Sequence, residues 1–112
     1  MRTLVRFLIF TLVISGCNSS PENAKAIEFK VWGNCGMCKK TIEGSLKDKP
    51  GIYSADWGVK SKQMKVVFDS TKLKSEDIHR FIASSGYDTD LKRGDDQAYA
   101  GLHSCCQYDR KP

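Results

Sequence analysis

The apolar residues change their spacing several times between residues 26 and 91, and this change constrains the fold more than any other feature. Residues 26–32 alternate apolar and charged side chains, which is typical of a half-buried strand. Residues 36–47 instead repeat an apolar side chain at every fourth position, which is typical of an amphipathic helix. Residues 52–57 and 64–68 again have the character of strands, so the first half of the pattern predicts a strand, a helix and two strands.

A second helix is predicted after Ser75, because Ser75 is a suitable N-cap residue and Gly86 suits the position just after the last turn. His79 is expected on the exposed side of this helix, and residues 87–91 are expected to form a short fourth strand. The order β-α-β-β-α-β predicts an α+β fold of the ferredoxin-like type, a four-stranded antiparallel sheet with two helices on one face. The predicted core consists of Ile27, Phe29, Val31, Ile42, Leu46, Val66, Phe68, Ile78, Phe81 and Ile82.

Residues 1–16 have the pattern of a secretory signal peptide, with two arginines before an apolar stretch too short to span a bilayer. The stretch ends in Ile-Ser-Gly before Cys17, which resembles a bacterial lipobox and predicts lipidation of Cys17. In the alternative, an ordinary signal peptide, Cys17 has no role. Residues 17–25 are predicted to be a polar tether. The protein is therefore expected in the bacterial cell envelope, anchored by lipid to a membrane and facing the periplasm or the exterior.

The charge of the mature chain argues against nucleic acid as a partner. Without the two arginines of the signal segment, the chain has 16 basic and 13 acidic residues, a net charge of +3. The lysines are spread among the acidic residues, whereas a nucleic-acid-binding protein has a dense basic stripe.

Four cysteines remain after Cys17, and their arrangement suits thiol chemistry better than disulfides. An even number of cysteines in an exported chain normally indicates disulfides. Here, however, Cys35 and Cys38 form one Cys-x-x-Cys pair, and Cys105 and Cys106 are adjacent in the sequence. Adjacent cysteines seldom bridge each other, because the small ring strains the peptide between them. The four residues are therefore interpreted as a set of free thiols.

Cys35 and Cys38 are predicted at the start of the first helix, where they could bind a soft metal ion. Unpaired N–H groups at a helix start, together with Lys39 and Lys40, favour the thiolate form. Thiolates select Cu(I), Zn(II) and similar ions over hard cations. Because no carboxylate or imidazole stands beside the pair, two-coordinate Cu(I) is favoured over tetrahedral zinc.

A thiol–disulfide oxidoreductase is the alternative function for the same pair. Cys-Gly-Met-Cys is close to the Cys-Gly-Pro-Cys of thioredoxin-type enzymes. A thioredoxin fold, however, places a proline opposite the pair about forty residues later, and this chain has no proline between Pro50 and Pro112. No paired carboxylates, Ser-His-Asp set or phosphate-binding glycine loop indicates an enzyme of another kind.

Four stretches in this order, VWGNCGMCKKTIE, PGIYSADW, KVVFD and SEDIHRFIASSGYDTD, resemble the heavy-metal-associated domain family over about residues 26–91. The family includes copper chaperones, the metal-binding domains of copper-exporting ATPases and a periplasmic mercuric ion carrier. The resemblance implies that Cys35 and Cys38 bind Cu(I), with Hg(II) and Zn(II) as alternatives. It also implies that Tyr87 lies near the metal loop. A metal-transporting ATPase or an efflux component is the expected partner, and no enzymatic activity is expected.

The chain departs from the family pattern in two places. The family usually has a methionine two residues before the first cysteine; here that methionine is absent, and Met37 lies between the two cysteines. Met37 is expected to fill the space under the loop, with a thioether ligand to Cu(I) as the alternative.

The second departure is the tail, residues 92–112, which lies beyond the minimal domain. Three alternatives remain open for its cysteines. Cys105 and Cys106 could complete a site shared with the Cys-x-x-Cys pair, or they could form a separate soft-metal site with His103. They could also be a redox-sensitive or inert pair.

Overall fold

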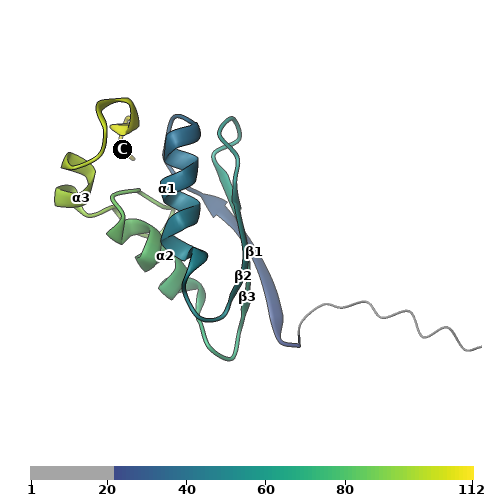
Figure 1. Cartoon of the computed structure of the whole chain (residues 1–112). Coiled ribbons are helices and arrows are strands. Elements are labelled where there is room, and N and C mark those ends of the chain that lie inside the picture. Colours follow the sequence, from purple (N-terminus) through teal and green to yellow (C-terminus); the bar gives the residue numbers. More distant parts are fainter. Residues whose placement is uncertain (1–21) are drawn as a thin grey trace, which may run out of the picture.

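The computed structural model describes residues 22–112, so the predicted signal peptide, the lipidation site Cys17 and most of the predicted tether lie outside the described residues (Figure 1). Within residues 22–112, none of the helices is both long enough and apolar enough to cross a membrane. The elements are β1 (Ala24–Lys30), α1 (Gly36–Lys47), β2 (Ile52–Trp57), β3 (Gln63–Asp69), α2 (Ser75–Ser84), α3 (Asp96–Ala100) and a 3-10 turn η1 (Ser104–Cys106).

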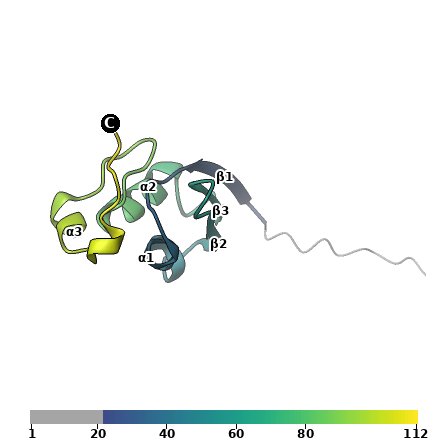
Figure 2. The same ribbon diagram turned by 90° about the horizontal axis from the view of Figure 1, so that it is seen from above.

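The strands form an antiparallel sheet in the order β1-β3-β2, and α1 and α2 both cover one face of it (Figures 1 and 2). Val66 of the central strand pairs with Ile27 of β1 on one side and with Ala55 of β2 on the other. This arrangement confirms the predicted ferredoxin-like α+β fold. The strand β1 begins at Ala24, two residues earlier than the alternation of side chains predicted.

The predicted fourth strand, residues 87–91, is not confirmed, since the sheet of the described residues has three strands. This segment lies beside β1 and forms a single antiparallel bridge between Val31 and Thr89. The Thr89 side chain ends the pairing, because its Oγ1 accepts hydrogen bonds from the N–H groups of Leu91 at 3.3 Å and Lys92 at 3.1 Å. The backbone thus turns away from β1 after one bridge.

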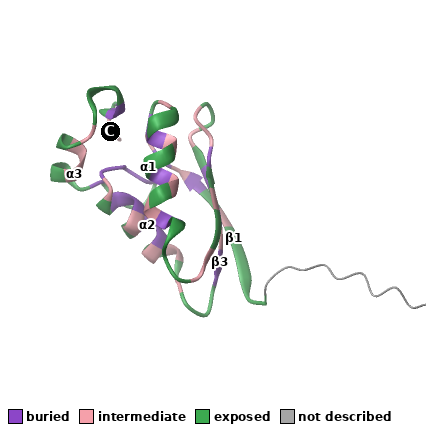
Figure 3. Ribbon diagram, in the orientation of Figure 1, coloured by how far each residue is buried: buried purple, intermediate pink, exposed green. Residues whose placement is uncertain are grey.

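The core lies between the sheet and the two long helices (Figure 3). Eight of the ten predicted core residues are buried, whereas Ile27 and Phe81 lie partly exposed at its border. Trp57 is a core residue that the alternation of β2 did not predict. It is fully buried, and its indole N–H donates to the carbonyl oxygen of Val31 at 3.1 Å. The other buried hydrophobic residues that were not predicted are Cys38, Met64, Ala83, Tyr87, Cys106 and Tyr108.

Two predictions about α2 are wrong. His79 is buried rather than exposed, because the segment after Gly86 folds over the helix and places Thr89 Oγ1 2.6 Å from the imidazole Nδ1. Burial lowers the pKa of His79, which favours the neutral ring. The N-cap residue is Lys74 rather than Ser75. The helix begins one residue earlier because the Asp77 carboxylate accepts a hydrogen bond from the Lys74 N–H at 2.8 Å.

Candidate metal centre

The Cys-x-x-Cys pair lies where β1 leads into α1, as predicted. Cys35 is the N-cap residue of α1, with extended backbone, and Cys38 lies buried in the first turn. Their Sγ atoms are 3.7 Å apart. The Cys38 thiol donates to the Asn34 side-chain oxygen at 3.0 Å, which orients this sulfur within the loop. The strand-to-helix junction therefore holds two free sulfurs close enough to bind one ion.

The helix start makes Cys35 acidic. Its pKa lies below the usual value for a thiol, because the backbone N–H groups of Cys38 and Met37 point at the sulfur and stabilise the thiolate. Partial burial opposes this effect without reversing it. A thiolate is the form that binds a soft metal.

The tail returns to this loop. Figures 1 and 2 show the C-terminal segment, drawn in yellow, beside the first turn of α1. The Sγ atoms of Cys35, Cys105 and Cys106 all lie within 4.8 Å of one another. The Cys105 and Cys106 sulfurs are 3.9 Å apart on η1. His103, the exposed residue before this turn, is not a member of the three-sulfur group.

Met37 does not fill the space under the loop, so that prediction is wrong. Its side chain is 48 % exposed. The buried face of α1 is set by Cys38, Ile42 and Leu46, and the residue before Cys38 therefore points away from the core. The Met37 Sδ instead lies 3.7 Å from the Cys105 Sγ, at the rim of the sulfur group.

Lys39 directs its charge away from the sulfurs. Its ammonium group lies 2.7 Å from the carboxylates of Glu43 and Asp56 and donates to the carbonyl oxygen of Trp57 at the same distance. The side chain thus ties α1 to the end of β2. The sequence predicted that the positive charge of Lys39 would lie beside the thiols. In the structure this charge is paired with the carboxylates of Glu43 and Asp56.

Tyr87 lies near the loop, fully buried, and its hydroxyl has no hydrogen-bond partner within residues 22–112. Burial, and then the neighbouring Cys38 sulfur, raise the pKa of Tyr87 far above its usual value. Burial also raises the pKa of Cys106 to about 12, with the thiols of Cys38 and Cys105 adding to the effect. Without a metal, Cys106 is therefore a protonated thiol beside the more acidic Cys35.

Tyr108 packs the tail onto the domain. Its ring stacks on Tyr87 with centroids 5.3 Å apart and meets the edge of Tyr99 at 5.2 Å. Its hydroxyl donates to the carbonyl oxygen of Gly86 at 2.7 Å and accepts from the N–H of Asp88 at 2.8 Å. No sequence pattern predicted these contacts. The only sign that the tail packs onto the domain was the presence of two aromatic residues in it, Tyr99 and Tyr108.

Asp88 is a second attachment point for the tail. Its fully buried carboxylate accepts two hydrogen bonds from the Arg110 guanidinium, at 2.7 and 3.1 Å. It also accepts from the N–H groups of Gly94 at 2.6 Å and Lys111 at 3.0 Å. Gly94 must be glycine, because a Cβ there would lie 2.7 Å from the backbone of Gly86. These contacts fix the path of the tail without involving any sulfur.

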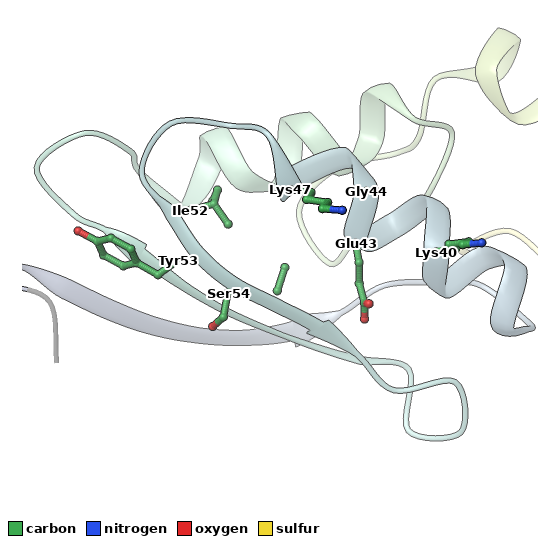
Figure 4. A pocket seen from close by; sticks show the side chains of 8 residues that line it. Lys40, Glu43, Gly44, Lys47, Ile52, Tyr53 and Ser54 are labelled. Carbon is green, nitrogen blue, oxygen red and sulfur yellow. The ribbon is translucent and has the colours of Figure 1, made fainter. Parts of the chain in front are cut away.

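A separate groove of about 540 Å³ lies between α1 and β2 (Figure 4). None of the side chains that line it is a thiol or an imidazole, so it does not offer the ligands that soft metals prefer. The lining residues are Lys40, Glu43, Gly44, Lys47, Ile52, Tyr53, Ser54 and Ala55. The candidate metal centre is therefore the sulfur group and not this groove.

The fold and the thiol pair at a strand-to-helix junction define a small ferredoxin-like domain of the kind found in metal carriers, and comparison with known proteins agrees. Residues 34–88 match the family model of the heavy-metal-associated domain. The copper chaperone CopZ of Staphylococcus aureus strain JH9 is 33% identical over 55 residues, which are 49% of this chain and 81% of that protein. The chain belongs to the heavy-metal-associated domain family.

Solved structures support the same conclusion. A CopZ metallochaperone superposes with a TM-score of 0.56 at 30% identity, covering 58% of this chain and 98% of the other. A copper-binding domain from HMA7, a P-type ATPase, superposes with a TM-score of 0.56 at 29% identity, covering 58% of this chain and 89% of the other. The family match ends at residue 88, so the tail with Cys105 and Cys106 lies outside it.

Proposed function

We propose that this protein captures a soft metal ion, Cu(I) in the first instance, through Cys35 and Cys38, and that it then transfers or sequesters the ion. The observation that carries the proposal is the pair of sulfurs 3.7 Å apart at the start of α1, where backbone N–H groups lower the pKa of Cys35. Ligand exchange between thiolates requires no further catalytic group. Metal transfer between proteins can therefore proceed from this loop alone.

Cu(I) is proposed because the sulfur group contains neither a carboxylate nor an imidazole. Soft thiolate ligands select Cu(I), and Hg(II) and Zn(II) are the alternative ions. The names of the relatives support copper, since they are a copper chaperone and a copper-binding domain of a P-type ATPase. A metal-transporting ATPase or an efflux component is therefore the proposed partner.

The oxidoreductase alternative uses the same thiol pair but has less support. A lowered pKa of Cys35 fits both functions. The three relatives described above are named as a copper chaperone, a metallochaperone and a copper-binding domain of a P-type ATPase. Metal carriage is therefore the favoured function.

Titration of the reduced full chain with Cu(I), without oxygen and against a competing chelator, tests the proposed function. We expect the protein to take copper from the chelator with a defined stoichiometry and to show no reduction of insulin disulfides. If the chelator keeps all the copper while the protein reduces insulin, the oxidoreductase alternative is correct instead.

We further propose that Cys17 carries a lipid that anchors the protein to a membrane, so that the metal-binding domain faces the periplasm or the exterior. The proposal comes from the sequence before Cys17 alone. We expect the full chain, expressed in bacteria, to incorporate a labelled fatty acid and to fractionate with membranes, because each buried acyl methylene contributes about 0.8 kcal/mol. The Cys17→Ala variant should lose the label, and retention of the label would exclude Cys17 as the lipidation site.

A further inference from the structure

We propose that Cys105 and Cys106 enter the metal centre and convert the open two-sulfur loop into a closed centre of at least three thiolates. This inference rests on the proposed function and deepens it. The Sγ atoms of Cys35, Cys105 and Cys106 lie within 4.8 Å of one another, and Cys38 Sγ lies 3.7 Å from that of Cys35. One soft ion can therefore contact sulfurs from both ends of the domain.

The distance between the two sulfurs of each cysteine pair fits a coordination number above two. With metal–sulfur bonds of about 2.3 Å, neighbouring sulfurs lie about 3.8 Å apart around a tetrahedral ion and about 4.0 Å apart around a trigonal ion. A linear ion with the same bonds would place its two sulfurs about 4.6 Å apart. The observed separations are 3.7 Å for Cys35 and Cys38 and 3.9 Å for Cys105 and Cys106. Both within-pair distances match the edge of a three- or four-sulfur centre, and the tail sulfurs lie within 4.8 Å of the Cys35 sulfur.

The sulfurs of the tail are positioned by contacts that do not depend on a metal. Tyr108, two residues after Cys106, is buried against Tyr87 and forms two hydrogen bonds with the backbone. Arg110 follows and pairs with the buried carboxylate of Asp88 at 2.7 Å. A ligand set that is already in place loses little conformational entropy when the ion binds. The tail is therefore built into the domain and is not a loose extension that meets the loop by chance.

The surroundings of the tail sulfurs are also suited to a soft ion. Cys106 is only 2 % exposed, within the apolar core cluster. At the rim, the Met37 thioether lies 3.7 Å from Cys105. Every donor in this group is sulfur, which excludes hard cations and favours ions such as Cu(I). On binding, each protonated thiol that becomes a ligand releases one proton to solvent, and no electron is transferred.

The closed centre changes how the ion leaves. A loop with two thiolates exposes the ion to the thiolates of a partner, whereas additional sulfurs occupy those positions. A partner must then displace the tail before it can take the ion. The tail thus makes this protein retain its ion more strongly than the family domain alone would.

X-ray absorption spectroscopy of the Cu(I)-loaded full chain counts the sulfurs directly. We expect at least three sulfurs per copper in the natural chain and two in the Cys105→Ser/Cys106→Ser variant. We also expect the variant to bind Cu(I) about 10- to 100-fold more weakly, the size of effect typical for loss of a supporting interaction in a metal site. The matched control is Ser104→Ala, which changes an exposed residue of the same turn and should alter neither result.

Two outcomes would overturn the inference. One is a count of two sulfurs in the natural chain, a measurement that needs no variant. The other is binding of two independent ions, one lost with each pair of cysteines, which would indicate a separate site in the tail. Neither outcome removes the proposed function. Undiminished copper binding after loss of Cys35 and Cys38, or a chain that takes no copper from the chelator, would do that, so the two failures can be told apart.

Discussion

Replacing Cys35 and Cys38 together by serine is expected to lower the affinity for Cu(I) by more than about 100-fold, because even the loss of a supporting group around a metal typically costs 10- to 100-fold. The substitution removes the thiol whose pKa is lowered by the start of α1, together with its neighbour at 3.7 Å. Hydroxyl groups are poor ligands for a soft ion. Competition with a Cu(I) chelator under anaerobic conditions measures the change.

The matched control for this variant is Met37→Leu, which lies between the two cysteines and is 48 % exposed. It removes a thioether but leaves all four thiols, so the affinity should change by only a few fold. Circular dichroism should show that the double variant remains folded, since Cys38 is buried. Full affinity in the folded double variant would mean that the proposed function is wrong.

Replacing Asp88 by alanine is expected to lower the free energy of unfolding by roughly 3–5 kcal/mol, the usual cost of breaking a buried ion pair. The carboxylate is fully buried and accepts hydrogen bonds from Arg110, Gly94 and Lys111. Urea denaturation measures this loss. A protease should also cleave the tail of the variant faster, because the Arg110 side chain and the N–H groups of Gly94 and Lys111 lose the carboxylate that holds them.

The Asp96→Asn variant is the control, since Asp96 also pairs with Arg110 but is 78% exposed. An exposed ion pair contributes about 1 kcal/mol or less, so this variant should be nearly as stable as the natural chain. Equal losses for Asp88→Ala and Asp96→Asn would show that the buried carboxylate has no special role.

The stability of the natural chain should also fall in acid, with Asp88 as one cause. Burial alone would raise the pKa of Asp88, but Arg110 and the backbone N–H groups of Lys111 and Gly94 together hold it below its usual value. The contribution of Asp88 is therefore complete above the unfolded pKa of about 3.9 and is lost as the pH falls through the lower pKa of the folded state. An Asp88→Asn variant should lose less stability below about pH 4 than the natural chain.

The sequence predicted the elements whose residues contact near neighbours in a regular period. The four-residue repeat of Cys38, Ile42 and Leu46 predicted α1, and the alternation around Phe29 and Val66 predicted the strands. The position of the thiol pair at the helix start followed from the boundary between these two periods. These features depend on local geometry, which the sequence expresses directly.

The features that were missed depend on side-chain contacts that no periodic pattern expresses, most of them between residues ten or more positions apart. The position of His79 on its own helix predicts an exposed side chain, whereas Thr89 covers it in the folded chain. Lys39 was expected to act on the thiols, but Asp56 of β2 pairs with its charge. A fourth strand was expected at residues 87–91, after the second helix, whereas the Thr89 side chain ends the pairing. In the first two cases a partner farther along the chain decided the outcome, and in the third a side chain bonded to the backbone two and three residues further on.

The sequence does not predict the path of the tail for the same reason. No periodic pattern connects Tyr108 with Tyr87 or Arg110 with Asp88, although these pairs direct Cys106 toward the loop. The length of the tail, residues 92–112, permits a return to the loop but does not require one. The structure shows that it does return, and a buried carboxylate in the last segment of the family domain is the residue that receives it.

The attachment of the tail at Asp88 has a consequence for competition between proteins. Thiols on a short tether are present at an effective concentration in the millimolar range, whatever the amount of protein. Even when Arg110 leaves Asp88, Cys105 and Cys106 therefore remain ready to rebind the ion before a free thiol in solution does. A receiving protein can overcome this advantage only by docking, which raises the local concentration of its own thiols to a similar level. The tail thus distinguishes a protein that docks from small thiols such as those of a redox buffer.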